Sequence, residues 1–350
     1  MSDFRDPPGR VSNTVRYAES WDEFKTLVET DANRGERVVL EAAGSPYTAG
    51  QTVAIDRPLT ADASRAVVEP ETDAQTLVEV TGQGSFGERH PKLYLTGRSP
   101  SGTYSGPMVF IDESSSNYGK SLHGAVKLAN EDGASILQSG EAVRVESGGL
   151  GGNHVTGVFL RCSVVGFETG LHIESGSSSG EYVNGNYFEG EMFGPDTAVR
   201  CIEGNGNLAG NEFRMQIDNA GDSSYGVRFQ GRSNVFRGVM FDANDYSGAG
   251  FDFDTGAYSC WGVVQNQTVN AASISGGPRG NYVYNFYDNS LYYDAGGSVQ
   301  QLRKRSLGAK GYGNGNTPTA GDWPQGALVE NTDDGTIWVK DSSSTMRQLI

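Results

Sequence analysis

The sequence predicts an all-β chain: a right-handed parallel β-helix with a helical cap at its N-terminal end and a small β meander at its C-terminal end. Two observations predict this fold. A unit of strand, turn and strand recurs about six times at spacings of 21 to 28 residues, and like residues fall into the same columns of that unit. Gly is abundant, at 49 of 350 residues, which is typical of many tight turns between short strands.

The N-terminal part predicts an attachment segment followed by a cap. Residues 1–19 are rich in charge and contain Pro and Gly, so we expect a flexible segment that attaches the chain to a larger particle. Ser20 and Glu23 form a capping box ahead of an apolar stripe, which predicts a short amphipathic helix. Residues 35–55 then predict a strand, a turn and a second strand, and residues 20–95 together form the cap and first strands.

Residues 96–300 carry the repeat, and the first strand of each unit supplies two apolar columns. One column contains Val143, Leu171, Val199, Val227, Phe251 and Ala272, and the other, two residues later, contains Val145, Ile173, Cys201, Phe229, Phe253 and Ile274. Strict alternation of this kind marks strands with one buried face. Each unit is therefore one coil of a solenoid, with its neighbours about 4.8 Å above and below.

The second strand of each unit carries an Asn column. It contains Asn153, Asn186, Asn211, Asn234 and Asn281, followed two residues later by Val155, Phe188, Phe213, Phe236 and Val283 respectively. Stacked Asn amides can hydrogen-bond from one coil to the next, as in cross-β stacks. We expect this column to lie inside the solenoid and to have a structural role at a turn.

Residues 301–350 differ in character from the repeat. A polar, Gly-rich connector with a basic run at residues 303–305 comes first. Residues 327–350 then predict a three-stranded meander, with a hairpin turn at Asp334 and Gly335 and a second turn at residues 341–344. A meander this small buries little surface alone, so we expect it to be stabilised by formation of a homotrimer.

The composition is strongly acidic and poor in Lys. The net charge is −16, with seven Lys against twenty Arg, which disfavours nucleic-acid binding and resembles the proteins of halophiles that accumulate salt; an acidic mesophilic protein is the alternative. The three Cys show no disulfide or metal spacing. We find no signal peptide and no apolar run long enough for membrane insertion, so we expect synthesis in a host cytoplasm.

Two sequence patterns resemble known families. Gly35, Val38, Leu40, Gly44 and Tyr47 follow the opening pattern of the pectate-lyase-like superfamily of β-helices, a resemblance that covers roughly residues 20–300. The pattern around the expected C-terminal meander resembles the short β modules that end many tail-fibre and spike proteins of tailed viruses. Together these resemblances imply a tail spike, fibre or turret subunit whose N-terminus contacts other virion proteins.

The outward column of the first strand supplies the first candidate site. It contains Arg144, His172, Arg200, Arg228 and Asp252, flanked by Glu146, Glu174, Gln230 and Asp254, with Glu203 nearby. One interpretation is a solvated ladder of salt bridges, because carboxylates compensate stacked guanidinium groups. The other is a groove that binds an acidic or sulfated glycan through His172, Arg200 and Arg228.

The outward positions of the second strand supply the remaining candidates. They are the pairs Thr156/Val158, Glu189/Glu191, Arg214/Gln216, Arg237/Val239 and Tyr284/Phe286. Trp261 and Tyr284 could form a sugar-stacking platform or a subunit contact. Glu189 and Glu191, about 7 Å apart along a strand, match the spacing of an inverting glycosidase, although such pairs are common on strands. Asp252 and Asp254 are the nearest approach to the Ca²⁺ ligands of a lyase.

The patterns favour an adhesive protein on a virion surface. The expected function is binding of a host surface glycan or glycoprotein by a virus of a halophile, without a cofactor beyond a structural divalent cation. A β-helical enzyme that cleaves polysaccharide and a purely structural virion component are the alternatives, because the same fold hosts all three. The four His show no metal spacing, and no metal site is expected.

Overall fold

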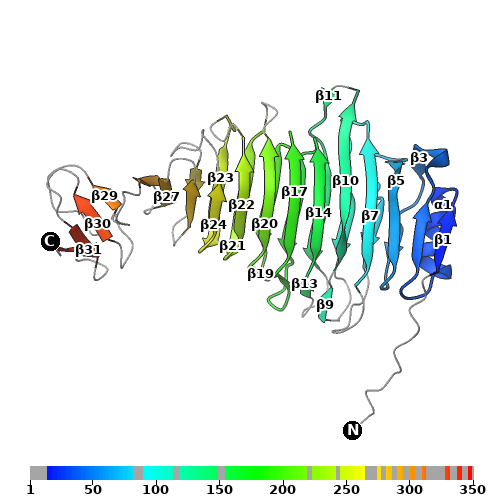
Figure 1. The fold of residues 1–350 in the computed structure, drawn as a ribbon, viewed down its shortest axis with the longest axis horizontal. Helices are drawn as coiled ribbons and strands as arrows, with labels where there is room; N and C mark the ends of the chain where they lie inside the picture. The colour runs from blue at the N-terminus through cyan, green and yellow to red at the C-terminus, as the bar shows by residue number, and fades with distance from the viewer. Residues whose placement is uncertain are drawn as a thin grey trace, which may run out of the picture.

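The computed structural model places the strands of the chain in two long sheets, built mostly of parallel strands, and one small sheet near the C-terminus. Figure 1 shows the strands side by side from the blue N-terminal end to the yellow coils, so the chain forms the all-β parallel β-helix that the repeat predicts. The described residues are 14–81, 90–112, 118–120, 122–133, 135–148, 154–218, 223–241, 245–264, 274–276, 281–285, 290–294, 299–303, 310–312, 328–331, 337–340 and 346–348.

Sheet A takes one strand from each coil. Its parallel strands, in spatial order, are β1 (Val15–Ala18), β2 (Arg37–Leu40), β5 (Thr60–Pro70), β7 (Lys92–Ser99), β10 (His123–Asp132), β14 (Phe159–Val165), β17 (Tyr187–Phe193), β20 (Glu212–Asp218), β22 (Val235–Met240), β24 (Trp261–Val264) and β26 (Tyr282–Asn285). At its margins, β3 (Tyr47–Ala49) pairs with β5 and β11 (Ser135–Ile136) pairs with β10. Neighbours in the sheet are a whole coil apart in sequence, as expected for a solenoid.

Sheet B forms further sides of the coil. Its main row is β4 (Val53–Ile55), β6 (Val78–Val80), β8 (Pro107–Asp112), β12 (Glu141–Ser147), β15 (Thr169–Ser175), β18 (Thr197–Glu203), β21 (Tyr225–Arg232), β23 (Ala249–Tyr258) and β25 (Ile274–Gly276). A short row, joined to the main row through β21, contains β9 (Tyr118–Lys120), β13 (His154–Thr156), β16 (Tyr182–Asn184) and β19 (Asn207–Ala209). The short row therefore belongs to the turn between the two long strands of a coil.

The inner faces of the two sheets meet in a continuous apolar core. Phe188 and Phe213 stack with ring centroids 5.6 Å apart, and Phe213 contacts Phe229 of sheet B at the same distance. Phe236 meets Phe251 edge to face at 5.6 Å. All five side chains are fully buried, and each such burial contributes about 2–3 kcal/mol of hydrophobic stabilisation. The predicted stacking of Phe inside the solenoid is confirmed.

The Asn column also lies inside, where each amide bonds the next coil. Nδ2 of Asn186 donates to Oδ1 of Asn211 at 3.0 Å, and Nδ2 of Asn211 donates to Oδ1 of Asn234 at 3.1 Å. The backbone N–H groups of Asn186 and Asn211 donate to the same two oxygens. Because a buried polar group without a partner costs about 1–3 kcal/mol, this ladder stabilises the turn. The predicted structural role of these residues is confirmed.

The column continues across a coil that lacks Asn. Cys260 occupies the slot there, and its backbone N–H donates to Oδ1 of Asn281 at 2.9 Å. Nδ2 of Asn281 in turn donates to the carbonyl oxygen of Ala257 at 3.1 Å. The amide of one Asn therefore serves the backbone of the preceding coil whichever residue stands there.

The register of the first unit differs from the prediction. Val158, not Asn153, occupies the Asn slot, and its backbone N–H donates to Oδ1 of Asn186 at 3.0 Å. Val155 lies instead on β13, where it pairs with Val183 of the short row. Val158 precedes Asn186 by 28 residues, the period of the neighbouring units, whereas Asn153, which lies outside the described residues, precedes it by 33.

This correction changes the outward positions of the first unit. Val158 is 1% exposed, and Thr156 lies on β13, so this pair is not on the outer face of sheet A. Arg161 and Ser163 take those outward positions on β14, in register with Glu189 and Glu191.

The register of the last unit is also shifted. Phe251 pairs with Ile274, and Phe253 pairs with Gly276, so Ile274 belongs to the first apolar column rather than the second. Ala272, the predicted member of the first column, lies outside the described residues. A shift of two residues leaves the same side chains on the same face, so alternation alone does not distinguish the two registers.

The N-terminal cap covers one end of the core. Helix α1 (Trp21–Thr26) continues into a π-helical turn (Leu27–Asp31), and Oγ of Ser20 accepts a hydrogen bond from the backbone N–H of Glu23 at 3.2 Å. Phe24 is fully buried against the first coil. The predicted capped amphipathic helix is confirmed; a short 3₁₀ turn, Ala42–Gly44, follows β2.

Sheet A begins inside the segment that the sequence assigns to attachment. Strand β1 pairs in parallel with β2 over its whole length. Residues 1–13 of this segment lie outside the described residues.

The C-terminal part leaves the parallel arrangement. Strands β27 (Ser290–Asp294) and β28 (Val299–Arg303) extend sheet A in antiparallel fashion after β26. The small sheet contains β29 (Lys310–Tyr312), β30 (Leu328–Asn331), β31 (Ile337–Lys340) and β32 (Met346–Gln348). Strands β30 to β32 are the predicted meander, and β29 adds a parallel strand to it. The predicted turns at Asp334–Gly335 and 341–344 lie outside the described residues.

Candidate functional site

The predicted binding residues divide between the outer faces of the two long sheets. His172, Arg200 and Arg228 lie in register on β15, β18 and β21 of sheet B. Trp261 and Tyr284 lie on β24 and β26 of sheet A. The structure therefore brings the first three together in one column but places the other two on a different surface.

The column on sheet B begins with a dense ion-pair network. Arg144 contacts Glu146 at 2.9 Å and Glu174 at 3.0 Å, with Glu141 at 3.7 Å. Nδ1 of His172 lies 2.7 Å from Glu141, and its Nε2 lies 3.5 Å from Glu174, too far for a hydrogen bond. One guanidinium group thus compensates three carboxylates on two neighbouring strands.

Burial and charge compete at Glu141. Burial raises the pKa of Glu141, but the hydrogen bond with His172 and the charges of Arg144 and Arg200 outweigh it, so the pKa lies below its ordinary value. His172 itself is only 4% exposed, which leaves little surface for a ligand. In this geometry His172 is a partner of Glu141 in the ion-pair network and is poorly accessible to a ligand from solvent.

The second half of the column is also compensated. Arg228 contacts Asp252 at 3.0 Å and Asp254 at 3.1 Å, and its guanidinium group lies over the ring of Tyr225 at 5.2 Å. Arg200, half-buried between the two networks, makes no ion pair with a described residue. The salt-bridge ladder, one of the two interpretations of this column, is therefore present at Arg144 and Arg228.

The rings of the candidate stacking platform are covered by their neighbours. The guanidinium group of Arg237 lies 4.9 Å from the ring centroid of Trp261, and Tyr282 of the next coil stacks on the same indole at 5.9 Å. Because strands of adjacent coils stand in register, ring faces meet one another and ring edges face outward. Tyr284 is half-buried in the adjacent column, and Phe286 lies outside the described residues.

The candidate catalytic carboxylates also have partners, including Tyr187 beside Glu189. Glu189 and Glu191 point outward from β17, and Oε1 of Glu191 accepts a hydrogen bond from Oγ of Ser163 at 2.9 Å. Asp252 and Asp254 are held by Arg228. Within the part of the chain that the structure describes, no three His, Cys, Asp or Glu side chains gather where they could hold a metal ion.

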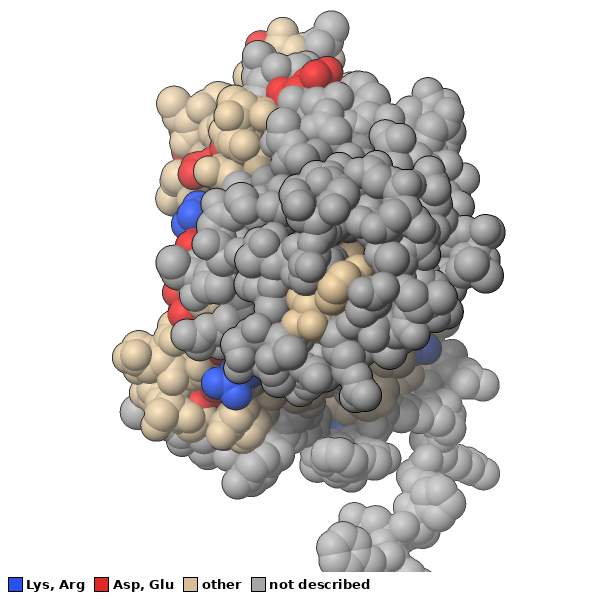
Figure 2. Space-filling model, turned by 90° about the vertical axis from the view of Figure 1, so that its left-hand side faces the viewer, with Lys and Arg blue, Asp and Glu red and all other residues tan. Residues whose placement is uncertain are grey.

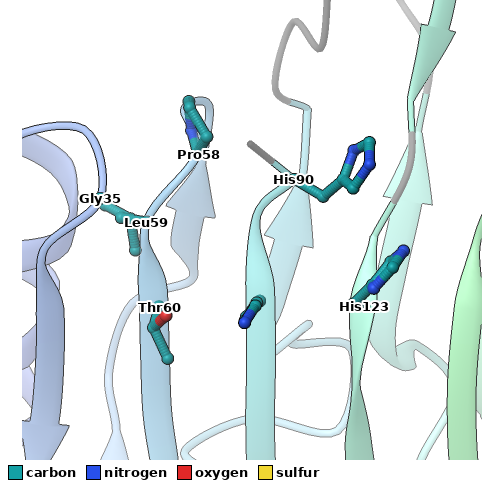
Figure 3. A pocket seen from close by; sticks show the side chains of 7 residues that line it. Gly35, Pro58, Leu59, Thr60, His90 and His123 are labelled. Carbon is teal, nitrogen blue, oxygen red and sulfur yellow. The ribbon is translucent and has the colours of Figure 1, made fainter. Parts of the chain in front are cut away.

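A cavity of about 400 Å³ lies where the strands of sheet A begin, at a place that the sequence did not single out. It is lined by Gly35, Pro58, Leu59, Thr60, His90, Lys92 and His123. Figure 3 shows His90, just before β7, beside His123 at the start of β10, with Pro58 and Leu59 across from them. Thr60, Lys92 and His123 are the first residues of β5, β7 and β10, so parallel pairing brings them to one edge.

A ladder of rings crosses the sheet from this cavity. His90 stacks on His123 at 4.9 Å, His123 lies 5.9 Å from Phe159, and Phe159 stacks on Tyr187 at 4.9 Å. Phe159 is 42% exposed, so the ladder presents apolar ring edges to solvent beside the cavity. The imidazole of His123 is thereby held between two other rings.

Three cations on adjacent strands of this region lack carboxylate partners. Lys92 on β7, Lys127 on β10 and Arg161 on β14 are exposed, and none makes an ion pair with a described residue. A second cavity of about 340 Å³ adjoins the first, with Thr60 and Lys92 in both linings. Arg37, which lines the second cavity, is paired with Asp62. Lys92 is therefore the cation of these two linings that makes no ion pair with a described residue.

Sequence reasoning missed this site because the first coils are irregular in length. The residues that stack at its edge are separated by 31 residues from Lys92 to His123, by 36 from His123 to Phe159 and by 28 from Phe159 to Tyr187. No fixed period aligns them. The available signal was chemical: two of the four His and two of the seven Lys occur within residues 90–123.

Elsewhere the coloured charges are mixed. Figure 2, which views the molecule from the C-terminal side, shows basic and acidic groups alternating along one edge.

Among the described residues no helix is both long and apolar enough to span a membrane. No protein-family model, curated protein or solved structure matches the chain.

Proposed function

We propose that the chain is a surface protein of a virus of a halophile, a tail spike, fibre or turret subunit, that adheres to an acidic glycan of its host. The glycan would lie on the outer face of sheet A. The observation that carries the proposal is that Lys92, Lys127 and Arg161, on adjacent strands, make no ion pair with a described residue in a chain of net charge −16, and that Lys92 lines a cavity. Cations left without carboxylates on an acidic surface favour an external anionic partner.

High salt makes such binding compatible with the acidic surface. The Debye length is about 3 Å in 1 M salt, so repulsion between the protein and a polyanion is screened beyond direct contact. Contacts at Lys92 and Arg161 keep most of their attraction, because the paired groups touch. The ligand chemistry that fits is a glycan with carboxylate or sulfate groups, and the carboxylates of uronic acids are one example.

The remaining parts of the proposal follow the sequence resemblances. The solenoid would be of the pectate-lyase-like kind, and the small C-terminal sheet would hold a homotrimer together, because it offers little core of its own. Light scattering of the full chain in molar KCl tests this assembly. A trimer supports the proposal, and a stable monomer counts against a fibre or spike.

Glycan binding is tested with two acidic polymers and one neutral polymer. The full chain is titrated with polygalacturonate, dextran sulfate and unmodified dextran, and heat is measured by calorimetry. We expect binding to at least one acidic polymer and none to dextran. Binding to none of them, or equal binding to all, would contradict the proposal and favour a purely structural component.

The same mixtures test polysaccharide cleavage, the alternative that the sequence left open. Release of reducing ends, or absorbance of an unsaturated product, would identify an enzyme. The variants Glu189→Gln and Asp252→Asn then show whether the candidate carboxylates carry the activity. Under the adhesive proposal neither product accumulates.

A further inference from the structure

We infer that the cavity bounded by His90, Lys92 and His123 is the subsite that receives the anionic substituent of the glycan, a carboxylate or a sulfate ester. This inference rests on the proposed function and names the place where the charge of the ligand would bind. Neither the charged columns nor the aromatic pairs that the sequence singled out include these three residues.

The size and lining of the cavity fit one charged sugar unit. Its volume of about 400 Å³ lies in the range of small-molecule sites. The ammonium group of Lys92, the hydroxyl of Thr60 and two imidazoles supply donors, and Pro58 and Leu59 line the opposite side with apolar surface. A sugar unit has this same division, with an anionic group on one side and C–H groups on its face.

Among the described residues no carboxylate pairs with Lys92, whereas Arg37 of the neighbouring cavity is paired. Asp62 holds the guanidinium group of Arg37, and Oδ1 of Asp62 also accepts a hydrogen bond from Oγ of Ser64 at 2.7 Å. Lys92 makes no ion pair with a described residue although it borders both cavities. An incoming anion therefore has Lys92 as its partner without breaking a salt bridge.

The donors are held in place before a ligand arrives. The ring of His123 lies between those of His90 and Phe159, at 4.9 and 5.9 Å. Gly124 follows it, and any Cβ there would overlap the carbonyl oxygen of Leu93, so β10 lies close against β7 at this point. Fixed side chains lose little conformational entropy on binding, which favours affinity.

The site also predicts a pH dependence. Burial lowers the pKa of His123, and the charges of His90 and Lys92 on the β7 side lower it further. On the β14 side the uncharged ring of Phe159 faces it. A bound anion supplies the opposite charge and raises this pKa again, so binding takes up a proton and tightens as the pH falls through the pKa of His123 in the complex.

The test uses monosaccharides and the imidazole signals of the full chain. Protein labelled with ¹⁵N-His is titrated with galacturonate, glucose 6-sulfate and neutral galactose, at the lowest KCl concentration that keeps it folded, because chloride competes for the same site. We expect the His90 and His123 signals to move with at least one acidic sugar and not with galactose. The two acidic arms distinguish a carboxylate site from a sulfate site.

Variants separate the subsite from its surroundings. Lys92→Gln and His123→Gln should each weaken binding of the acidic sugar about tenfold, because each removes a charged or charge-assisted contact. Arg98→Gln, a cation at the far end of the same strand, should change it less than about twofold, as expected for a screened distant charge. Far-UV circular dichroism checks that each variant keeps its strands.

The outcomes distinguish the subsite from the proposed function. If acidic polymers bind but Lys92→Gln and His123→Gln bind them and the acidic sugars as well as the wild type, the subsite is wrong and the adhesive function stands. If the acidic sugars move the His123 signal while no polymer binds, the subsite stands and the adhesive function is wrong. Equal shifts with galactose overturn the anion selectivity.

Discussion

The outer faces of sheets A and B are built by the same coils but dispose their charges differently. On sheet B, Arg144 contacts three carboxylates and Arg228 contacts two, so most basic groups are neutralised within the face. On the N-terminal half of sheet A, Lys92, Lys127 and Arg161 make no ion pair with a described residue. Sheet A also holds ion pairs, Arg37 with Asp62 and Arg98 with Glu69 among them, so the difference between the faces lies in these three cations, which remain available for a partner.

The difference follows from what each coil places beside its cations. On sheet B the registers set Glu146 beside Glu174 next to Arg144, and Arg228 beside Asp252, whereas Ile202 takes the carboxylate position next to Arg200. On sheet A the strands beside Arg161 supply Ala125 and Glu189, and no ion pair forms. On a repetitive scaffold, basic side chains without an ion pair therefore indicate where an external partner binds.

The largest expected effect is on sheet B. His172→Leu should lower the free energy of unfolding by about 2 kcal/mol, because Glu141 would keep a buried charge without its hydrogen-bond donor. Urea unfolding in molar KCl, followed by far-UV circular dichroism, measures this loss. His123→Leu on sheet A is the matched control and should lose less than about 0.5 kcal/mol. Equal losses would remove the distinction between the faces.

The same variant predicts a change in acid stability. The pKa of Glu141 lies below its ordinary value of 4.5, so the unfolded chain binds more protons than the folded chain as the pH falls from neutral toward acid. This carboxylate therefore contributes stability above pH 4.5 that is lost below it. In His172→Leu the free energy of unfolding should decrease less steeply as the pH falls below 4.5. An unchanged pH dependence would show that the pKa of Glu141 does not depend on His172.

A smaller effect compares two arginines. Arg144→Met should cost about 1 kcal/mol, and Arg161→Met less than about 0.5 kcal/mol, because only the first leaves carboxylates without a partner. Both side chains are replaced by one of similar length that keeps the apolar stem. Urea unfolding at two KCl concentrations measures the gap, which should narrow as salt screens the pairs.

The smallest expected effect is a change in titration at the cavity. In Lys92→Gln the pKa of His123 should rise toward, but not reach, its ordinary value of 6.5, because burial is the largest cause of its depression. Titration of the ¹⁵N-His signals measures it. No rise would show that the charge of Lys92 does not act on His123, and the two residues would then not form one electrostatic site.

Much of the fold could be predicted because the repeat period and the alternation of apolar and polar residues are visible in the sequence. Asn186, Asn211 and Asn234 align since each must satisfy the same backbone groups, and Phe188 and Phe213 follow them into the core. The first and last units were assigned in the wrong register. In the first unit Asn153 was placed in a slot that Val158 fills at the regular period of 28 residues. In the last unit a shift of two residues preserves alternation, so the pattern does not distinguish the registers.

The candidate site was predicted less well than the fold. The column of His172, Arg200 and Arg228 was correctly assembled from the period, but the ion pairs that occupy Arg228 depend on side-chain geometry that the sequence does not carry. The cavity at Lys92 and His123 forms where coils of unequal length bring strand starts together. That juxtaposition is a property of the folded register.

Binding of an acidic glycan to the outer face of sheet A is tested most directly by removing two cations from each face and comparing affinities. Lys92→Gln/Arg161→Gln on sheet A and Arg200→Gln/Arg228→Gln on sheet B each lose two charges, and their affinity for polygalacturonate is measured by calorimetry in KCl. The account predicts that the sheet A variant binds at least about 30-fold more weakly than the wild type, while the sheet B variant stays within about threefold. The reverse order would contradict it and move the binding face to the sheet B column.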